Sequence, residues 1–71
     1  MNRRELQGRK LLKLRRDMYK SRRQISELTK VSQSALVKYE LGTKLAPTDK
    51  LIALCDFYGV TPNEVLGYEE N

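Results

Sequence analysis

The side chains best suited to chemistry gather in residues 32–40, which read Ser-Gln-Ser-Ala-Leu-Val-Lys-Tyr-Glu. Leu36 and Tyr39 recur there at helical spacing, which predicts a short helix with one buried edge. Its outward face offers Gln33, Ser34 and Lys38. An amide, a hydroxyl and an ammonium are groups that hydrogen-bond to the edges of nucleobases. The segment therefore predicts a helix that can read base edges.

Each polar candidate has a specific expected partner. Gln33 can bond an adenine in bidentate fashion, and Lys38 can reach guanine or a phosphate. Val37 or Ala35 can contact a thymine methyl group. Ser32 is expected to cap the helix first, by accepting from its free amides, and to contact a phosphate or base second. The alternative for Gln33 is a polar residue that only solvates a helix end.

The elements before this segment are predicted to be helical. Leu11, Leu14 and Met18 recur at helical spacing, so residues 3–18 are expected to form a first amphipathic helix. Ser21 is expected to cap a second helix, with Ile25 and Leu28 as its apolar positions. A three-residue turn, Lys30-Val31-Ser32, separates it from the base-reading helix.

Two further helices are predicted after residue 41. Gly42 is expected to end the third helix with a positive φ, and residues 43–47 to form a loop. A fourth, densely apolar helix begins at Pro47-Thr48 and stops at Gly59. A short fifth helix follows, in which Thr61 is the cap, Pro62 the first helical residue and Glu64 the residue that reaches back; Val65 and Leu66 are its apolar residues.

Charge is distributed unevenly along the 71 residues. Residues 1–44 carry thirteen Lys and Arg against four acids, giving +9, whereas residues 45–71 carry one Lys against five acids, giving −4. A basic half attracts a polyanion through counterion release. The alternative is that the charges only keep a small domain soluble. A helix lined by Arg9, Lys13 and Arg16 is open to the same two interpretations, partial phosphate contact or solvation.

Length and composition favour a single soluble domain over residues 1–71. The longest apolar run, Leu51 to Cys55, is too short to cross a bilayer, and no secretory signal is expected. The single Cys55 cannot form an internal disulfide and is expected to be a buried small hydrophobe rather than a redox sensor. These features predict a cytoplasmic protein.

Residues 25–40, Ile-Ser-Glu-Leu-Thr-Lys-Val-Ser-Gln-Ser-Ala-Leu-Val-Lys-Tyr-Glu, closely resemble the Cro/C1-type (XRE) helix-turn-helix family. The resemblance extends through Gly42 and Pro47 to the Gly59-Val60-Thr61 step and covers about residues 8–67. It implies an all-α, compact, five-helix, lambda-repressor-like DNA-binding domain, with the helix-turn-helix at helices two and three. The chain departs from the family at Lys30, where glycine is usual, and at Arg22, where glutamine is usual.

The resemblance implies where DNA is contacted. Base contacts fall on the outward face of the third helix, at Gln33, Ser34, Val37 and Lys38. Phosphate contacts fall on the cations and the cap that flank it, namely Lys20, Arg22, Arg23, Lys30, Ser32 and Lys44. Tyr39 is expected to be a core residue, and Glu40 to bond locally with backbone or a nearby Arg.

Useful specificity normally requires a two-fold dimer with recognition helices about 34 Å apart. A homodimer is therefore expected, through the less basic second half of the chain. Candidate contacts are Tyr58, Val60, Val65, Leu66 and Tyr68, each of which can instead complete the monomer core.

The favoured function is sequence-specific binding of double-stranded DNA by a small phage or bacterial repressor acting as a dimer on a pseudo-palindromic operator. An antitoxin-type autoregulator is the second interpretation, and an interaction module that has lost DNA binding is the third. An enzyme is disfavoured because the chain has no histidine, one cysteine and no phosphate-binding glycine loop. No cofactor, metal, membrane or small-molecule ligand is expected.

Overall fold

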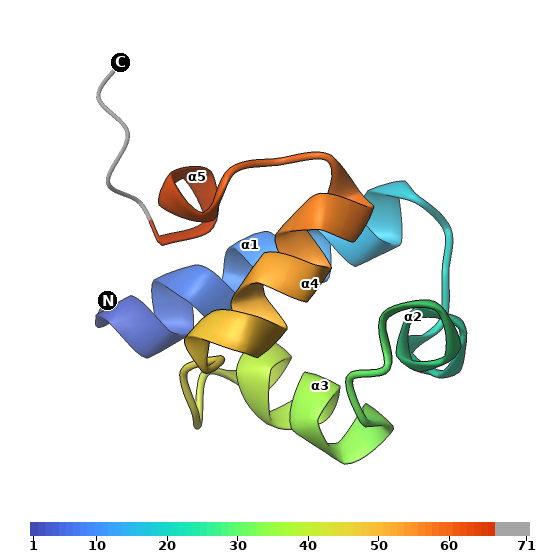
Figure 1. The fold of residues 1–71 in the computed structure, drawn as a ribbon. Coiled ribbons are helices and arrows are strands. Elements are labelled where there is room, and N and C mark those ends of the chain that lie inside the picture. Colours follow the sequence, from blue (N-terminus) through green and yellow to red (C-terminus); the bar gives the residue numbers. More distant parts are fainter. Residues whose placement is uncertain (67–71) are drawn as a thin grey trace.

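Five helices form between residues 1 and 66, the part of the chain that the computed structural model describes. They are α1 (Arg3–Asp17), α2 (Arg22–Thr29), α3 (Gln33–Leu41), α4 (Thr48–Tyr58) and α5 (Pro62–Leu66) (Figure 1). No strand occurs in this range, so the predicted all-α class and the five-helix order are confirmed. None of these helices combines the length and the apolar character that a membrane span requires.

Side-chain caps set the starts of α2 and α3 where the sequence predicted them. Ser21 Oγ accepts a hydrogen bond from the Gln24 amide at 3.1 Å, and Gln24 Oε1 accepts from the Ser21 amide at 2.8 Å. Ser32 Oγ accepts from the Ala35 amide at 3.1 Å. These bonds satisfy amides that the first helical turn leaves free, so each helix begins at a defined residue.

The predicted cap of α5 is also present. The Glu64 amide donates to Thr61 Oγ1 at 3.3 Å, and Glu64 Oε2 accepts from the Thr61 amide at 3.1 Å. Pro62 is the first residue of this helix, as the sequence indicated. Five residues provide few internal hydrogen bonds. The short helix therefore depends on this reciprocal pair of bonds at its start.

Left-handed residues end three of the helices. Gly42 ends α3 with φ 78°, as predicted, and Gly59 ends α4, as predicted, with φ 73°. Lys30 ends α2 with φ 67°, which is the conformation expected for the turn although the residue is not glycine. Tyr19, just after α1, also has a positive φ of 55°. That conformation was not predicted.

The core lies between α1, α4 and the inner sides of the other helices. Helix α1 contacts α3 and α5, and α4 contacts α2 and α5. In Figure 1, α4 crosses in front of α1, with α3 and α5 on opposite sides of the pair. The buried hydrophobic residues are Leu11, Ile25, Val31, Leu36, Tyr39, Ala46, Leu51, Leu54, Cys55 and Val65. Tyr39 and Cys55 are thus core residues, as predicted.

Three residues that the periodicity assigned to apolar helix faces are exposed instead. Leu28 is 57% exposed because the buried stripe of α2 runs from Ile25 to the half-buried Thr29, one residue further along. Met18 is 38% exposed because α1 ends at Asp17 and the chain then turns away. Ile52, one of the residues that make the predicted fourth helix densely apolar, is 46% exposed, at the side of the α4 face that buries its neighbours. The predictions for these positions were wrong.

Candidate nucleic-acid interface

The N-terminus of α3 is open to solvent and carries three exposed polar residues. They are Ser32, Gln33 and Ser34. Ser32 adopts extended backbone angles and uses its hydroxyl as the cap, while Ser32 Oγ and Ser34 Oγ lie 3.3 Å apart and share a hydrogen bond. The remaining first-turn amides carry the positive end of the helix dipole, which favours an anion at this end.

The outward face of α3 continues from this end along the helix. Lys38 is exposed, and Val37 and Ala35 are half-buried. The opposite side packs inward, with Leu36 and Tyr39 at 1% and 3% exposure. Neither the Gln33 amide nor the Lys38 ammonium has a hydrogen bond to another side chain within residues 1–66. The face that the sequence designated for base contacts is therefore available to an external partner.

Cations flank this helix on both sides. Lys30 is exposed in the turn before α3, and Lys44 is exposed in the loop after it. Lys20 is half-buried, and Arg23 is exposed in the first turn of α2, where it pairs with Glu27 at 3.3 Å. An exposed pair of this kind contributes little to stability. Arg23 can therefore exchange Glu27 for an external anion at small cost.

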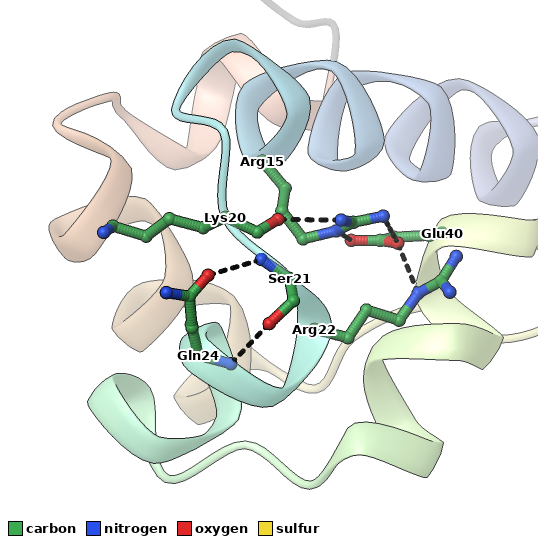
Figure 2. Close-up of polar contacts among 6 residues, drawn as sticks. All are labelled: Arg15, Lys20, Ser21, Arg22, Gln24 and Glu40. Carbon is green, nitrogen blue, oxygen red and sulfur yellow. Dashed lines mark hydrogen bonds and ion pairs between the residues drawn. The ribbon is translucent and has the colours of Figure 1, made fainter.

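Arg22 differs from the other predicted phosphate contacts because it is bound to a buried carboxylate. Its Nε donates to Glu40 Oε1 at 2.8 Å. Arg15 binds the same carboxylate, with Nε donating to Oε2 at 2.8 Å and Nη2 to Oε1 at 3.0 Å. Figure 2 shows the two arginines reaching Glu40, a residue of α3, from α1 and α2. Of the two partners expected for Glu40, backbone or a nearby Arg, the structure shows arginine, although both arginines come from other helices and not from the local sequence.

The Glu40 cluster, defined as Arg15, Arg22 and Glu40, joins three helices and one loop. Arg15 Nη1 also donates to the Lys20 carbonyl at 2.9 Å, directly before the cap of α2. The hydrogen bond to Glu40 raises the pKa of Arg15 above its usual value, and burial opposes that rise. Breaking a buried pair by removing one partner costs about 3–5 kcal/mol, so the cluster strongly resists separation of these elements.

The sequence did not lead us to predict that Arg15 and Gln7 point inward and make hydrogen bonds there. Each lies four residues from Leu11, so a helical projection places both beside a buried leucine of α1. Gln7 is 1% exposed, and its Oε1 accepts from the Ala46 amide at 2.9 Å. That bond attaches the loop after α3 to α1. The sequence did contain an indication of these contacts, because both polar residues lie on the apolar stripe of α1.

The residues proposed for a dimer contact fall into three groups. Val65 is 1% exposed, so of the two alternatives given for it, it completes the monomer core. Tyr58, Val60 and Leu66 are half-buried against the core. Tyr68 lies outside the described residues. A shallow apolar pocket of about 160 Å³ opens between α1 and α5, where Leu14, Val60 and Val65 form part of its lining.

Acidic and sulfur-bearing side chains do not converge in the described residues. Within residues 1–66 there is no group of three or more His, Cys, Asp or Glu that could hold a metal ion. Cys55 is buried and free. The concentration of exposed polar groups at α3 and its flanks is therefore the main candidate site of the molecule.

A capped α3 that follows α2 through a three-residue turn, with an exposed polar face, defines the helix-turn-helix class. A family model described as "Helix-turn-helix domain" matches residues 8–69, which is most of the chain. The chain belongs to this family of helix-turn-helix domains, of the Cro/C1 type, and the resemblance inferred from residues 25–40 is confirmed. No curated protein and no solved structure matches the chain.

Proposed function

We propose that this protein is a sequence-specific regulator of transcription that binds double-stranded DNA, in the manner of a small phage or bacterial repressor. The observation that carries this proposal is the exposed polar face of α3. This helix begins at a side-chain cap, and the chain belongs to a family of helix-turn-helix domains. In this class the second helix of the motif enters the major groove by its N-terminal end. Occupancy of an operator would then exclude polymerase.

The base contacts are proposed for the face of α3. Gln33 reads an adenine through its amide, Lys38 reads guanine or a phosphate, and Val37 contacts a thymine methyl group. Ser34 adds a hydroxyl within the same first turn. An interaction module that had lost DNA binding would have no need for these side chains to remain exposed between flanking cations, which argues against that alternative.

The phosphate contacts are proposed for the flanking groups. These are Lys20, Arg22, Arg23, Lys30, Ser32 and Lys44. Phosphate contacts fix the register of a protein on the duplex without reading sequence. Because each neutralised phosphate contributes about −0.9 to the slope of log K against log salt concentration, we expect affinity to fall steeply with salt.

A dimer would place two α3 helices on successive major-groove turns of a pseudo-palindrome, about 34 Å apart. Tyr58, Val60 and Leu66 are the remaining described candidates for its interface, and the apolar pocket between α1 and α5 adjoins Val60. The proposed setting is the bacterial cytoplasm, where such an operator would be accessible.

Selection of bound sites from random duplexes tests the proposal, since a palindromic consensus is the expected result. Gln33→Ala should then reduce discrimination between the consensus and its variants by about 1–3 kcal/mol at one base pair. Asn63→Ala, which removes an exposed amide from α5, is the control and should leave discrimination unchanged. Equal binding of every duplex by the unmodified protein would rule out sequence-specific regulation.

A further inference from the structure

Arg22 divides its guanidinium between an internal partner and solvent. Its Nε donates to Glu40 Oε1, whereas neither Nη group makes a hydrogen bond to any residue in the range 1–66. The Arg22 side chain is 36% exposed, while that of Glu40 is 2% exposed. One donor is thus held by a buried carboxylate, and the remaining donors are available to an external anion.

The charges of the Glu40 cluster do not cancel. One carboxylate faces two guanidinium groups, so a single positive charge is left over. The Arg15 side chain is 12% exposed and makes two of the three hydrogen bonds to Glu40. Its Nη1 donates a further hydrogen bond to the Lys20 carbonyl. The uncompensated charge therefore belongs to the more exposed Arg22, at the first residue of α2.

We propose that Glu40 is a positioning residue for DNA binding, which holds Arg22 through Nε so that its two Nη groups bind one phosphate of the duplex. This inference rests on the proposed function. Because Glu40 belongs to α3, the same carboxylate fixes that phosphate contact relative to the side chains that read bases. An arginine that is already held loses less side-chain freedom on binding than a free one.

The neighbouring Arg23 lacks this arrangement and supplies a matched comparison. It follows Arg22 in the first turn of α2 and also pairs with a carboxylate, but the side chains of Arg23 and Glu27 are 78% and 67% exposed. Such a pair holds its arginine weakly. Arg22 and Arg23 therefore differ in positioning while having the same side chain and the same charge.

The test replaces each arginine with lysine and measures affinity for the selected operator. A lysine Nζ can bind Glu40 or the phosphate, but it lacks the planar set of donors with which a guanidinium group binds both. Arg22→Lys should weaken binding about tenfold, the factor for one lost hydrogen bond to a charged group, and Arg23→Lys by less than about threefold. Both variants keep the charge, so the salt slope should not change. Equal losses in the two variants would overturn the inference.

Two measurements separate positioning from stability. In the Glu40→Gln background, the difference between arginine and lysine at position 22 should shrink to less than about twofold, provided that thermal melting shows a folded protein. Independently of that variant, the Nε–H signal of Arg22 in ¹⁵N NMR of the unmodified protein should stay protected from exchange when operator is added. Loss of that protection on binding would mean that Arg22 leaves Glu40, which overturns the inference.

Failure of this inference is distinguishable from failure of the proposed function. If the unmodified protein binds no duplex, the proposed function fails and this inference falls with it. If it binds the selected operator and the two lysine variants behave alike, only the role of Glu40 is overturned.

Discussion

Two residues other than glycine adopt a left-handed backbone conformation that glycine normally occupies. Lys30 has φ 67° in the turn between α2 and α3, and Tyr19 has φ 55° after α1. For a residue with a Cβ atom this conformation costs about 1–2 kcal/mol. Lys30 lies among the proposed phosphate contacts, whereas the Tyr19 side chain is 94% exposed and gains no packing that would offset the cost. Tyr19 is therefore a site of uncompensated strain.

Tyr19→Gly should raise the free energy of unfolding by about 1 kcal/mol, because glycine adopts this conformation without a steric penalty. For a domain of this size that corresponds to a rise in Tm of about 4–8 °C, which circular dichroism can follow. Tyr19→Ala keeps the Cβ atom and is the control. An equal gain from alanine would show that the aromatic ring, and not the backbone, is responsible.

Tyr58 should make the fold sensitive to alkaline pH. Burial, together with the negative charge of Glu40, raises the pKa of Tyr58 from 10.0 to about 12, while Arg15 opposes the rise. The folded state thus favours the neutral phenol. Its contribution to stability is complete below pH 10, the value for the unfolded chain, and is lost as the pH rises through about 12.

We expect the free energy of unfolding to fall between pH 9 and pH 11.5 less steeply in Tyr58→Phe than in the unmodified protein, by denaturant titration. The Tyr58 hydroxyl has no hydrogen-bond partner in the described part of the chain, so phenylalanine should cost little at neutral pH. Tyr39 and Cys55, whose pKa values burial also raises, remain in both proteins. Parallel pH profiles would contradict the assignment to Tyr58.

At the scale of elements, Gly8 allows α1 and α3 to approach each other closely. A Cβ atom at this position would lie 2.8 Å from the Glu40 carbonyl oxygen and nearer still to that of Tyr39. Both obstacles are backbone atoms near the end of α3, so neither can move without moving the helix. The close approach also brings α1 to the part of α3 that carries Glu40.

Gly8→Ala should therefore destabilise the protein, although alanine favours a helix. The expected loss is about 1–3 kcal/mol, the usual cost of an added methylene in a close-packed site. Arg9→Ala, on the exposed side of the same helix, is the control and should change stability by less than about 0.5 kcal/mol. Unchanged thermal melting of Gly8→Ala would contradict this description of the α1–α3 contact.

The elements could be predicted from the sequence wherever local chemistry defines them. Ser21, Ser32 and Thr61 mark helix starts, and Gly42 and Gly59 mark helix ends, because caps and left-handed residues act within one turn. Which residues of a helix are buried depends on neighbouring helices. Periodicity therefore failed at Leu28 and Ile52, each beside a buried stripe and not on it.

The candidate site was predictable only in its outward residues. The exposure of Gln33, Ser34 and Lys38 follows from one helix and its apolar edge. The partners of Glu40 are 25 and 18 residues away, on two other helices, so no local pattern identified them. Long-range polar pairing requires the arrangement of α1, α2 and α3, which a single sequence does not supply.

At the scale of the whole molecule, Cys55 lies in the core that the helices share. It is 1% exposed on α4, and burial raises the pKa of its thiol, with Asp56 and Glu64 adding to the rise. Both effects suppress reaction, because the attacking species is an exposed thiolate. The thiol should therefore react only when the core opens.

Reaction of the native protein with a disulfide reagent such as DTNB at pH 8 should be at least about a thousandfold slower than that of the unfolded chain, as expected for a domain stable by 5 kcal/mol or more. The rate should rise with denaturant in parallel with the loss of helix in circular dichroism. Cys55→Ser is the control and should give no signal. Rapid labelling of the folded protein would contradict the buried position of Cys55.

The Glu40 cluster also limits how the proposed DNA-reading surface can be transferred to another protein. A fragment spanning residues 21–42 would carry Glu40 without Arg15, leaving the carboxylate short of the partner that makes most of its bonds. Gln33 and Lys38, by contrast, make no side-chain hydrogen bond to α1 within residues 1–66. Under the proposed function, target preference can be changed by exchanging outward side chains of α3 in place, whereas grafting the motif onto a foreign scaffold requires an arginine supplied from a third helix.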